Sequence, residues 1–224
     1  DLPSQQELIL LCFDSFDDAL NCGAQLRQFH PSAIETVDEM VINAARKDRG
    51  WSSISDFLGT AKDDARAILF VEFTNEYVRQ VKEAIEFVQS KYSLVHSSLL
   101  TSKEEIRLAW SFRSRSVGLL SSVEGSKTPI PFVEDCAVPP EVLSPFIRDF
   151  RKILHSHELS VGMFGHVDAG VIHVRPAMNM ENVDDRALVH SIMEKVATLV
   201  QSYGGILWGE HGKGFRSAFG PSVF

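Results

Sequence analysis

The sequence predicts an α+β fold in which helices pack on a ferredoxin-like antiparallel sheet, extended by a C-terminal helical and hairpin region. Two observations predict it. Up to Val95, short apolar runs typical of buried strands alternate with amphipathic helical stretches in the order β-α-β-β-α-β. From Pro129 onward, further helical stretches and short strands follow. A chain of 224 residues, 44% of them hydrophobic, is long enough to bury a core of this kind.

The first half of the chain supplies the sheet. Leu8–Phe13 is an unbroken apolar run, as expected for a strand covered on both faces. Ser15 and Asp18 then have the spacing of a capping box, which predicts the start of a helix carrying Leu20 and Leu26. The further expected elements are a strand at Ala33–Val37, a polar helical stretch to Lys47, a strand at Ala67–Phe73, a helix at Tyr77–Val88 and a strand that begins at Tyr92–Val95.

The second half supplies longer helices around a hairpin. Apolar residues recur at helical spacing, and Gly and Pro clusters separate the stretches. Gly204-Gly205 resembles a helix C-cap, which predicts where the last helix ends. The expected elements are helices at Lys103–Leu120, Val142–Leu154 and Leu188–Val200, a loop at Gly125–Pro131, strands at Val161–Phe164 and Val171–Val174, and a last strand at Ile206–Trp208.

Composition argues against several classes of partner. A formal net charge of −8 and a pI near 5.5 give little attraction to nucleic acid or to an anionic membrane. The three cysteines form no C-x-x-C pair, which favours a reducing compartment, and we expect a cytoplasmic protein. Apolar runs fall short of the ~18 residues of a transmembrane helix. Because the chain opens at Asp1 and ends just after the Gly220-Pro221 turn signal, we expect an excised piece with both ends truncated.

Two histidines flank a predicted hairpin turn. A turn centred between Ala169 and Gly170 would place His166 directly opposite His173 on one face of the sheet. Opposed residues have Cβ atoms roughly 4.5 to 5.5 Å apart, close enough for two imidazoles to bind one metal ion. The alternative is a pair of structural strand histidines.

The segment Gly209–Gly214 follows the last apolar strand and places Glu210 and His211 between glycines, which let a backbone approach a ligand closely. With Glu210 as third ligand, the histidine pair becomes a His₂Glu set with an open position, as in catalytic divalent-metal sites. The alternative is a Gly-rich turn before a helix. The spacing matches neither a Walker loop nor a dinucleotide-binding motif.

Arg113 falls on the apolar stripe of its predicted helix, together with Ala109 and Trp110, and a charge in that position needs a partner. The partner is either a structural Asp or Glu or a substrate carboxylate, which arginine can bind with two parallel hydrogen bonds. Further cations, which we interpret as solvated surface charges, are Arg115, Arg175, Lys213 and Arg216.

The two motifs resemble those of the FAD-linked oxidase C-terminal domain, in the vanillyl-alcohol-oxidase superfamily. The likeness covers nearly the whole chain and extends to bacterial proteins that fuse a flavin dehydrogenase to an iron–sulfur region, similar to D-2-hydroxyglutarate and D-lactate dehydrogenases. The stretches that carry it are Gly165–Pro176, Gly209–Gly214, Glu35–Asp38, the Arg113 helix ending in Val117–Leu120, and Pro131–Asp135 through Val138–Pro140.

The resemblance implies a role for each matching residue. His166, His173 and Glu210 would hold a zinc-like divalent ion, and Arg113 would bind the substrate carboxylate. His211 would be the catalytic base beside the flavin, flanked by Gly209 and Gly212.

It also implies what surrounds this domain. FAD would be bound mainly by an N-terminal domain outside this chain, and an iron–sulfur cluster would lie elsewhere in the parent protein. The substrate would be a D-2-hydroxy acid oxidised to the 2-oxo acid, and the chain alone would be inactive.

Residues 1–224 would form one domain, with a possible division into a ferredoxin-like half at 1–124 and a metal-motif half at 125–224. This chain departs from the family pattern at Val133, where many D-2-hydroxyglutarate enzymes carry lysine, and at Val117, which replaces a small hydroxyl residue.

Two other functions fit the residues. A non-enzymatic ferredoxin-like module that binds a ligand or partner would use the histidines structurally, and metal content separates it from the enzyme. A metal-dependent hydrolase would use the same His₂Glu set with water as nucleophile, but beyond His211 the sequence shows no clear second acid/base pair.

Overall fold

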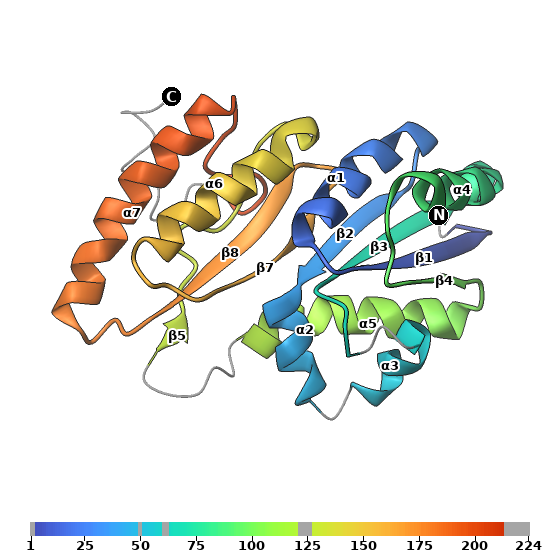
Figure 1. Ribbon diagram of the computed structural model, residues 1–224, viewed down its shortest axis with the longest axis horizontal. Coiled ribbons are helices and arrows are strands. Elements are labelled where there is room, and N and C mark those ends of the chain that lie inside the picture. Colours follow the sequence, from blue (N-terminus) through green and yellow to red (C-terminus); the bar gives the residue numbers. More distant parts are fainter. Residues whose placement is uncertain (1–2, 49–50, 60–62, 121–126, 213–224) are drawn as a thin grey trace.

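The protein is described here by a computed structural model, which covers residues 3–48, 51–59, 63–120 and 127–212. Its described strands form an eight-stranded sheet in the order β4-β1-β3-β2-β7-β8-β5, with β6 paired to β8 (Figure 1). All the pairings are antiparallel. The strands are β1 Gln6–Phe13, β2 Ala33–Asp38, β3 Ala67–Thr74, β4 His96–Leu100, β5 Thr128–Pro129, β6 Cys136–Ala137, β7 Val161–His166 and β8 Val171–Met178.

The order β4-β1-β3-β2 confirms the ferredoxin-like sheet. The connecting helices α1 (Phe16–Leu26) and α4 (Val81–Lys91) cover one face of it, as expected. The oxygen of Ser15 accepts the N–H of Asp18 at 3.3 Å, so the predicted cap begins α1. The remaining helices are α2 Glu39–Arg46, α3 Ser52–Leu58, α5 Lys103–Leu120, α6 Leu143–His155 and α7 Val183–Ser202.

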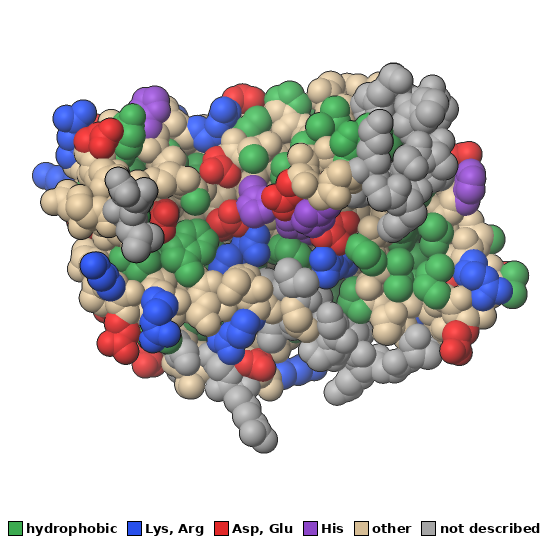
Figure 2. Space-filling view, turned by 180° about the vertical axis from the view of Figure 1, so that it is seen from behind, with side chains coloured by type: hydrophobic (Ala, Val, Ile, Leu, Met, Phe, Trp, Pro, Cys, Tyr) green, Lys and Arg blue, Asp and Glu red, His purple; other side chains and the backbone are tan. Residues whose placement is uncertain are grey.

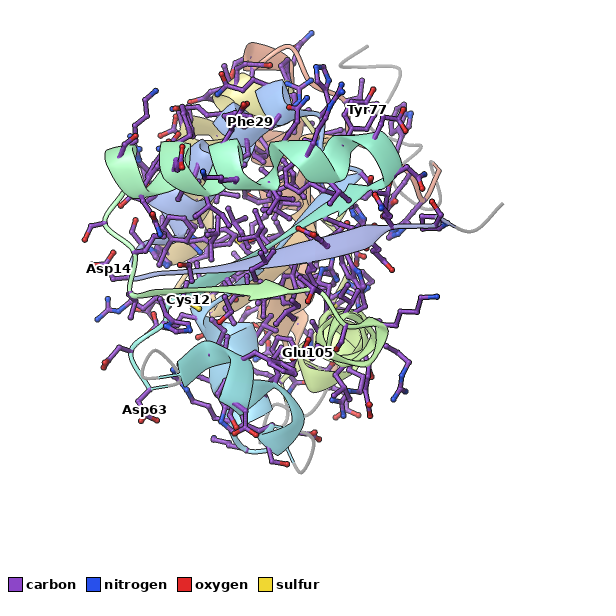
Figure 3. The ribbon with its side chains drawn as sticks, turned by 90° about the vertical axis from the view of Figure 1, so that its right-hand side faces the viewer. Cys12, Asp14, Phe29, Asp63, Tyr77 and Glu105 are labelled. Atoms are coloured by element: carbon purple, nitrogen blue, oxygen red, sulfur yellow. The ribbon has the colours of Figure 1, made fainter. Side chains whose placement is uncertain are left out.

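Helices cover both faces of the sheet, which explains the unbroken apolar runs in its central strands. In β1, Ile9 and Leu11 pack into the core beneath α1, α4, α6 and α7, whereas Leu8 and Leu10 pack against α2, α3 and α5. Successive side chains of a strand point to opposite faces, so a strand buried on both sides is apolar throughout. Figure 3 shows these layers edge-on, with α4 above the strands and α3 and α5 below them.

The sheet continues from the ferredoxin-like half into the C-terminal half through β2 and β7, where Glu35 pairs with His166. Residues 131 positions apart are therefore neighbours on one sheet. The β7–β8 hairpin follows, and α6 and α7 cover the same face as α1 (Figure 1).

Some elements differ from the sequence predictions. Tyr92–Val95 is a connection, and β4 begins at His96. The side chains of Tyr92 and Leu94 pack on the core, but the backbone of these two residues does not belong to a strand. Ile206–Trp208 is no strand, because Ile206 makes only an isolated bridge to Ala137. Helix α3 was not predicted. The start of the predicted Gly125–Pro131 loop lies outside the described residues, and the rest is not all loop, because Thr128–Pro129 pairs with β8 as the short strand β5.

Among the described residues, no helix has both the length and the apolar character needed to span a membrane. Cys12, Cys22 and Cys136 are all buried, and none of them forms a disulfide.

Candidate functional site

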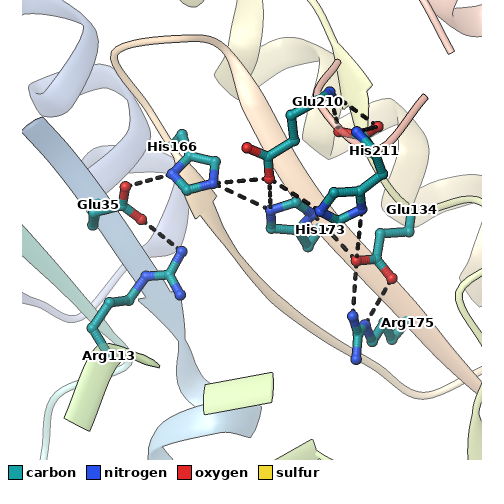
Figure 4. Close-up of polar contacts among 9 residues, drawn as sticks. Glu35, Arg113, Glu134, His166, His173, Arg175, Glu210 and His211 are labelled. Atoms are coloured by element: carbon teal, nitrogen blue, oxygen red, sulfur yellow. Dashed lines mark hydrogen bonds and ion pairs between the residues drawn. The ribbon is translucent and has the colours of Figure 1, made fainter. Parts of the chain in front are cut away.

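Stretches far apart in the sequence meet on the α5 face of the sheet, where β2, β7 and β8 lie side by side (Figure 4). Strand β2 contributes Glu35, the β7–β8 hairpin contributes His166, His173 and Arg175, and α5 contributes Arg113. Loops contribute the rest, Glu134, Asp135, Glu210 and His211. In the space-filling view, histidines gather with acidic side chains in the middle of one surface, with basic side chains beside them (Figure 2).

The hairpin brings the two histidines together, but in a register different from the predicted one. His166 pairs with Val171, and His173 pairs with Phe164, so the histidines are diagonal neighbours and not directly opposed. The turn is centred one residue earlier than predicted, between Asp168 and Ala169, and includes Gly170 at φ +69°. The register moves by two residues and therefore preserves the face, because side chains alternate with a period of two. The Nε2 atoms of the histidines lie 3.4 Å apart.

Glu210 completes the predicted cluster. Its Oε1 lies 3.1 Å from Nε2 of His166 and 3.0 Å from Nε2 of His173. The three side chains present one ligand atom each, all within 4.8 Å of one another. His173 is buried, whereas Glu210 is exposed, so the cluster opens to solvent on one side. The structure therefore brings together the three residues that the sequence proposed as ligands.

A carboxylate lies behind each histidine. Glu35 hydrogen-bonds Nδ1 of His166, and this bond, opposed by burial, raises the pKa of His166 above its usual value. Oε1 of Glu134 lies 3.4 Å from Nδ1 of His173. Burial alone would raise the pKa of Glu134, but His173 and Arg175 outweigh it and lower the pKa to about 2. Both carboxylates therefore favour imidazoles whose Nδ1 carries the proton and whose Nε2 faces Glu210.

The partner of Arg113 is a protein carboxylate. Its Nη2 lies 2.6 Å from Oε2 of Glu35, and the residue is only 7% exposed. Its guanidinium also lies over the ring of Phe164, 5.1 Å from the centroid. Glu35 thus joins Arg113 to His166, while Arg113 Nε has no hydrogen-bond partner among the described residues.

His211 lies beside the cluster. Its ring stacks on His173 with centroids 5.0 Å apart and planes 9° from parallel. Its Nε2 is 3.2 Å from Oε1 of Glu210, and its Nδ1 is 3.5 Å from Oε1 of Glu134. The side chain is 48% exposed, so a small molecule can reach it.

The glycines of the segment differ in what they permit. A Cβ on Gly209 would lie 2.9 Å from a methyl group of Val171 and 3.1 Å from Asp135, so the close approach of this segment requires glycine. Gly212 has φ +71°, with open space around it. Lys213 and Arg216 lie outside the described residues.

Arg175, which the sequence predicted to be a solvated surface charge, is mostly buried and paired. It donates two hydrogen bonds of 2.8 Å to Glu134, and its side chain is 20% exposed. The prediction of a solvated charge is therefore wrong here, because the buried Glu134 needs a counter-charge. Arg115 lies 3.6 Å from Asp48, with both side chains more than 40% exposed.

An open cavity of about 720 Å³ adjoins the cluster. Glu35, Arg113 and His166 line its inner part. Gln6 of β1 and residues of α5 line the remainder. The α5 residues include the half-buried Trp110, the exposed Ser111 and two exposed cations, Lys103 and Arg107, that make no ion pair among the described residues.

Sequence reasoning assigned no role to Glu35, Glu134 or Asp135. A signal existed for Glu35, because it places a charge within a short apolar strand, where a buried partner is required. Glu134 and Asp135 form an acidic pair between Val133 and the buried Cys136, which is a weaker signal of the same kind.

Fold and site together define an α+β domain with a candidate divalent-metal centre beside a solvent-open cavity. The chain belongs to the family described as FAD linked oxidases, C-terminal domain, which matches residues 2–220. It is 43% identical over 230 residues to a D-2-hydroxyglutarate dehydrogenase of Pseudomonas putida and 38% identical over 237 residues to one of Escherichia coli. Both alignments cover 100% of this chain but 23% of the relative.

More distant proteins share the family fold. A D-lactate dehydrogenase of Archaeoglobus fulgidus is 23% identical over 95% of this chain and 44% of its own length. Among solved structures, p-cresol methylhydroxylase with bound substrate superposes with a TM-score of 0.61 over 93% of this chain and 46% of that one, at 12% identity. The 4-ethylphenol oxidase of Gulosibacter chungangensis superposes with a TM-score of 0.60 over 96% of this chain and 48% of that one, also at 12% identity. These structural likenesses confirm the fold alone.

Proposed function

We propose that this chain is the substrate- and metal-binding part of a flavin-dependent dehydrogenase that oxidises a D-2-hydroxy acid to the 2-oxo acid. The observation that carries the proposal is the cluster of His166, His173 and Glu210, with His211 stacked beside it. The names of the relatives support the substrate class. The chain spans about a quarter of the D-2-hydroxyglutarate dehydrogenases that it matches, so the complete activity belongs to a larger protein.

The cluster fits a divalent ion such as zinc. Two imidazole nitrogens and one carboxylate are the ligand set of many catalytic zinc sites. Carboxylates behind ligand histidines fix the ring orientation, and Glu35 and Glu134 occupy those positions. When bound, the ion would supply Lewis-acid chemistry that lowers the pKa of the substrate hydroxyl, and FAD would supply the hydride acceptor.

The remaining side chains would bind and deprotonate the substrate. His211 is exposed and adjoins the cluster, so it would take the hydroxyl proton at Nε2. Arg113 would bind the carboxylate next to the reacting carbon, because it lines the cavity beside the cluster. Since Glu35 already occupies Nη2, the substrate would meet the other donors of the guanidinium.

The cavity along α5 favours a substrate that carries a second carboxylate. Lys103 and Arg107 line it, and neither has an ion-pair partner among the described residues. The acidic tail of a 2-hydroxyglutarate-type substrate would extend toward these cations, whereas lactate has no group to reach them. This region would therefore select the tail, although the family's lysine is replaced by Val133.

The flavin would be held mainly by an N-terminal domain of the parent protein, with His211, Gly209 and Gly212 facing it from this chain. Electrons would leave through an iron–sulfur cluster elsewhere in that protein, which we propose to be cytoplasmic. We propose that residues 1–224 form one domain, because β2 and β7 join the halves before and after residue 124 in one sheet.

The test is reduction of FAD in the full-length protein by a panel of D- and L-2-hydroxy acids that includes 2-hydroxyglutarate and lactate. We expect bleaching of the flavin absorbance with D-2-hydroxyglutarate and a smaller kcat/KM with D-lactate. No bleaching with any hydroxy acid by a protein loaded with FAD and zinc would reject the function. A ferredoxin-like binding module without chemistry would reduce no flavin and, unlike the proposed enzyme, would bind no stoichiometric zinc.

A further inference from the structure

We propose that Glu134 and Asp135 act together as a positioning unit: Asp135 fixes the segment that carries Glu210 and His211, and Glu134 orients both His173 and His211. The pair links the two sequence motifs, which lie on separate elements and, over the described residues, form no common strand ladder. This inference rests on the proposed function, because orienting these side chains matters only if they bind a metal ion and accept a proton.

Asp135 binds the backbone of the segment. Its two carboxylate oxygens accept the N–H of Glu210 at 2.9 and 3.1 Å, and Oδ2 also accepts the N–H of His211 at 2.9 Å. Its carbonyl oxygen accepts the N–H of Gly209 at 2.8 Å. One fully buried residue thus holds three consecutive N–H groups of a segment outside the sheet.

The backbone of Asp135 is itself unusual. It has φ +73°, in the left-handed region that residues with a Cβ rarely adopt. Such a conformation persists only where surrounding contacts enforce it. Here it lets adjacent carboxylates serve different targets, since Asp135 binds backbone groups and Glu134 binds side chains.

Glu134 lies against both imidazoles. Its Oε1 is 3.4 Å from Nδ1 of His173 and 3.5 Å from Nδ1 of His211, whose rings are stacked. An ionised carboxylate only accepts hydrogen bonds, so it favours the tautomer with the proton on Nδ1 in both rings. The lone pair of each Nε2 then faces Glu210, where one histidine is needed as a ligand and the other as a proton acceptor.

Two parallel relays converge on the cluster. Arg175 binds Glu134, which contacts His173, and Arg113 binds Glu35, which contacts His166 (Figure 4). Only the Glu134 relay reaches a second imidazole, that of His211. We therefore expect a change at Glu134 to affect metal binding and proton transfer together.

The test substitutes Glu134→Gln in the full-length, FAD-loaded protein, because glutamine keeps the size but removes the charge and one acceptor. We expect the Kd for Zn²⁺, measured by competition with a chromophoric chelator, to rise about 10- to 100-fold. At saturating zinc, we expect kcat for D-2-hydroxyglutarate to fall about 10-fold or more, with KM changed less than kcat. Arg175→Lys, which keeps a charge but loses the two parallel hydrogen bonds, should shift both quantities the same way by a smaller factor.

Asp38→Asn is the matched control. Asp38 is also buried, caps α2 and has an arginine partner, Arg151 at 3.5 Å, but it makes no hydrogen bond or ion pair with the three histidines of the site. This variant should keep the wild-type zinc affinity and kcat. If Glu134→Gln does not fold, Arg175→Lys decides the point by the same two measurements.

The outcomes separate the inference from the function on which it rests. Wild-type protein that binds no zinc and reduces no FAD overturns the proposed function. If the wild type does both, then a folded Glu134 or Arg175 variant with unchanged zinc affinity, or with unchanged kcat, overturns the positioning role. A lower melting temperature alone would assign Glu134 to the stability of the domain.

Discussion

Arg113 offers a sharp test because it has a structural partner and a proposed ligand. In Arg113→Ala, Glu35 would keep its charge with its side chain only 12% exposed. Removing one partner of a buried ion pair costs ~3 to 5 kcal/mol, and the residual exposure and the nearby His166 place the expected loss of unfolding free energy at about 3 kcal/mol. Losing the charge-assisted contact to the substrate carboxylate costs ~1.5 to 3 kcal/mol more, at the transition state.

A second variant separates the two effects. In Arg113→Ala/Glu35→Gln the buried negative charge is gone as well, so urea unfolding of the 224-residue chain should show most of the lost stability restored. Activity should not return. We expect kcat/KM in the full-length protein at saturating zinc to stay about 100-fold below wild type in both variants. Normal kcat/KM per folded molecule in Arg113→Ala would refute the substrate role and leave Arg113 as a stabilising residue only.

The remaining predictions concern the metal, a buried acid and the hairpin turn. Wild-type protein should bind about one zinc ion, and His166→Ala and His173→Ala should bind far less; equal metal content in all three would contradict the ligand assignment. Burial raises the pKa of Asp38 from 3.8 to about 6, so the folded state binds the proton more tightly. Stability should therefore fall as pH rises from about 4 to about 6, by on the order of 2 to 3 kcal/mol. Urea unfolding should show no such fall in Asp38→Asn. Gly170→Ala should destabilise the protein by more than about 1 kcal/mol, because its Cβ would lie 1.8 Å from a carbonyl oxygen at φ +69°; wild-type stability would show that the turn can move.

Much of the site follows from the sequence because its parts obey local periodicities. Alternation along strands predicted that His166 and His173 share a face, and this held although the hairpin register was wrong by two residues. The apolar runs of β1 and β3 and the helical spacing of the intervening segments predicted the ferredoxin-like half. Gly209, next to Glu210, marked a segment that lies close to the side chains of Val171 and Asp135.

Only the tertiary structure decided which charges meet. Glu35 and His166 are 131 residues apart, and no local pattern predicts that β2 pairs with β7 and joins them. The ion pair of Glu35 with Arg113 depends on the packing of α5 against β2, and that of Glu134 with Arg175 depends on the pairing of β6 with β8. The sequence by itself determined the ligand types and the faces on which they lie, because side-chain chemistry and backbone periodicity are local. The partners that orient those ligands were decided by sheet order and loop docking, because burial makes a charge depend on whichever counter-charge the fold brings within hydrogen-bonding distance.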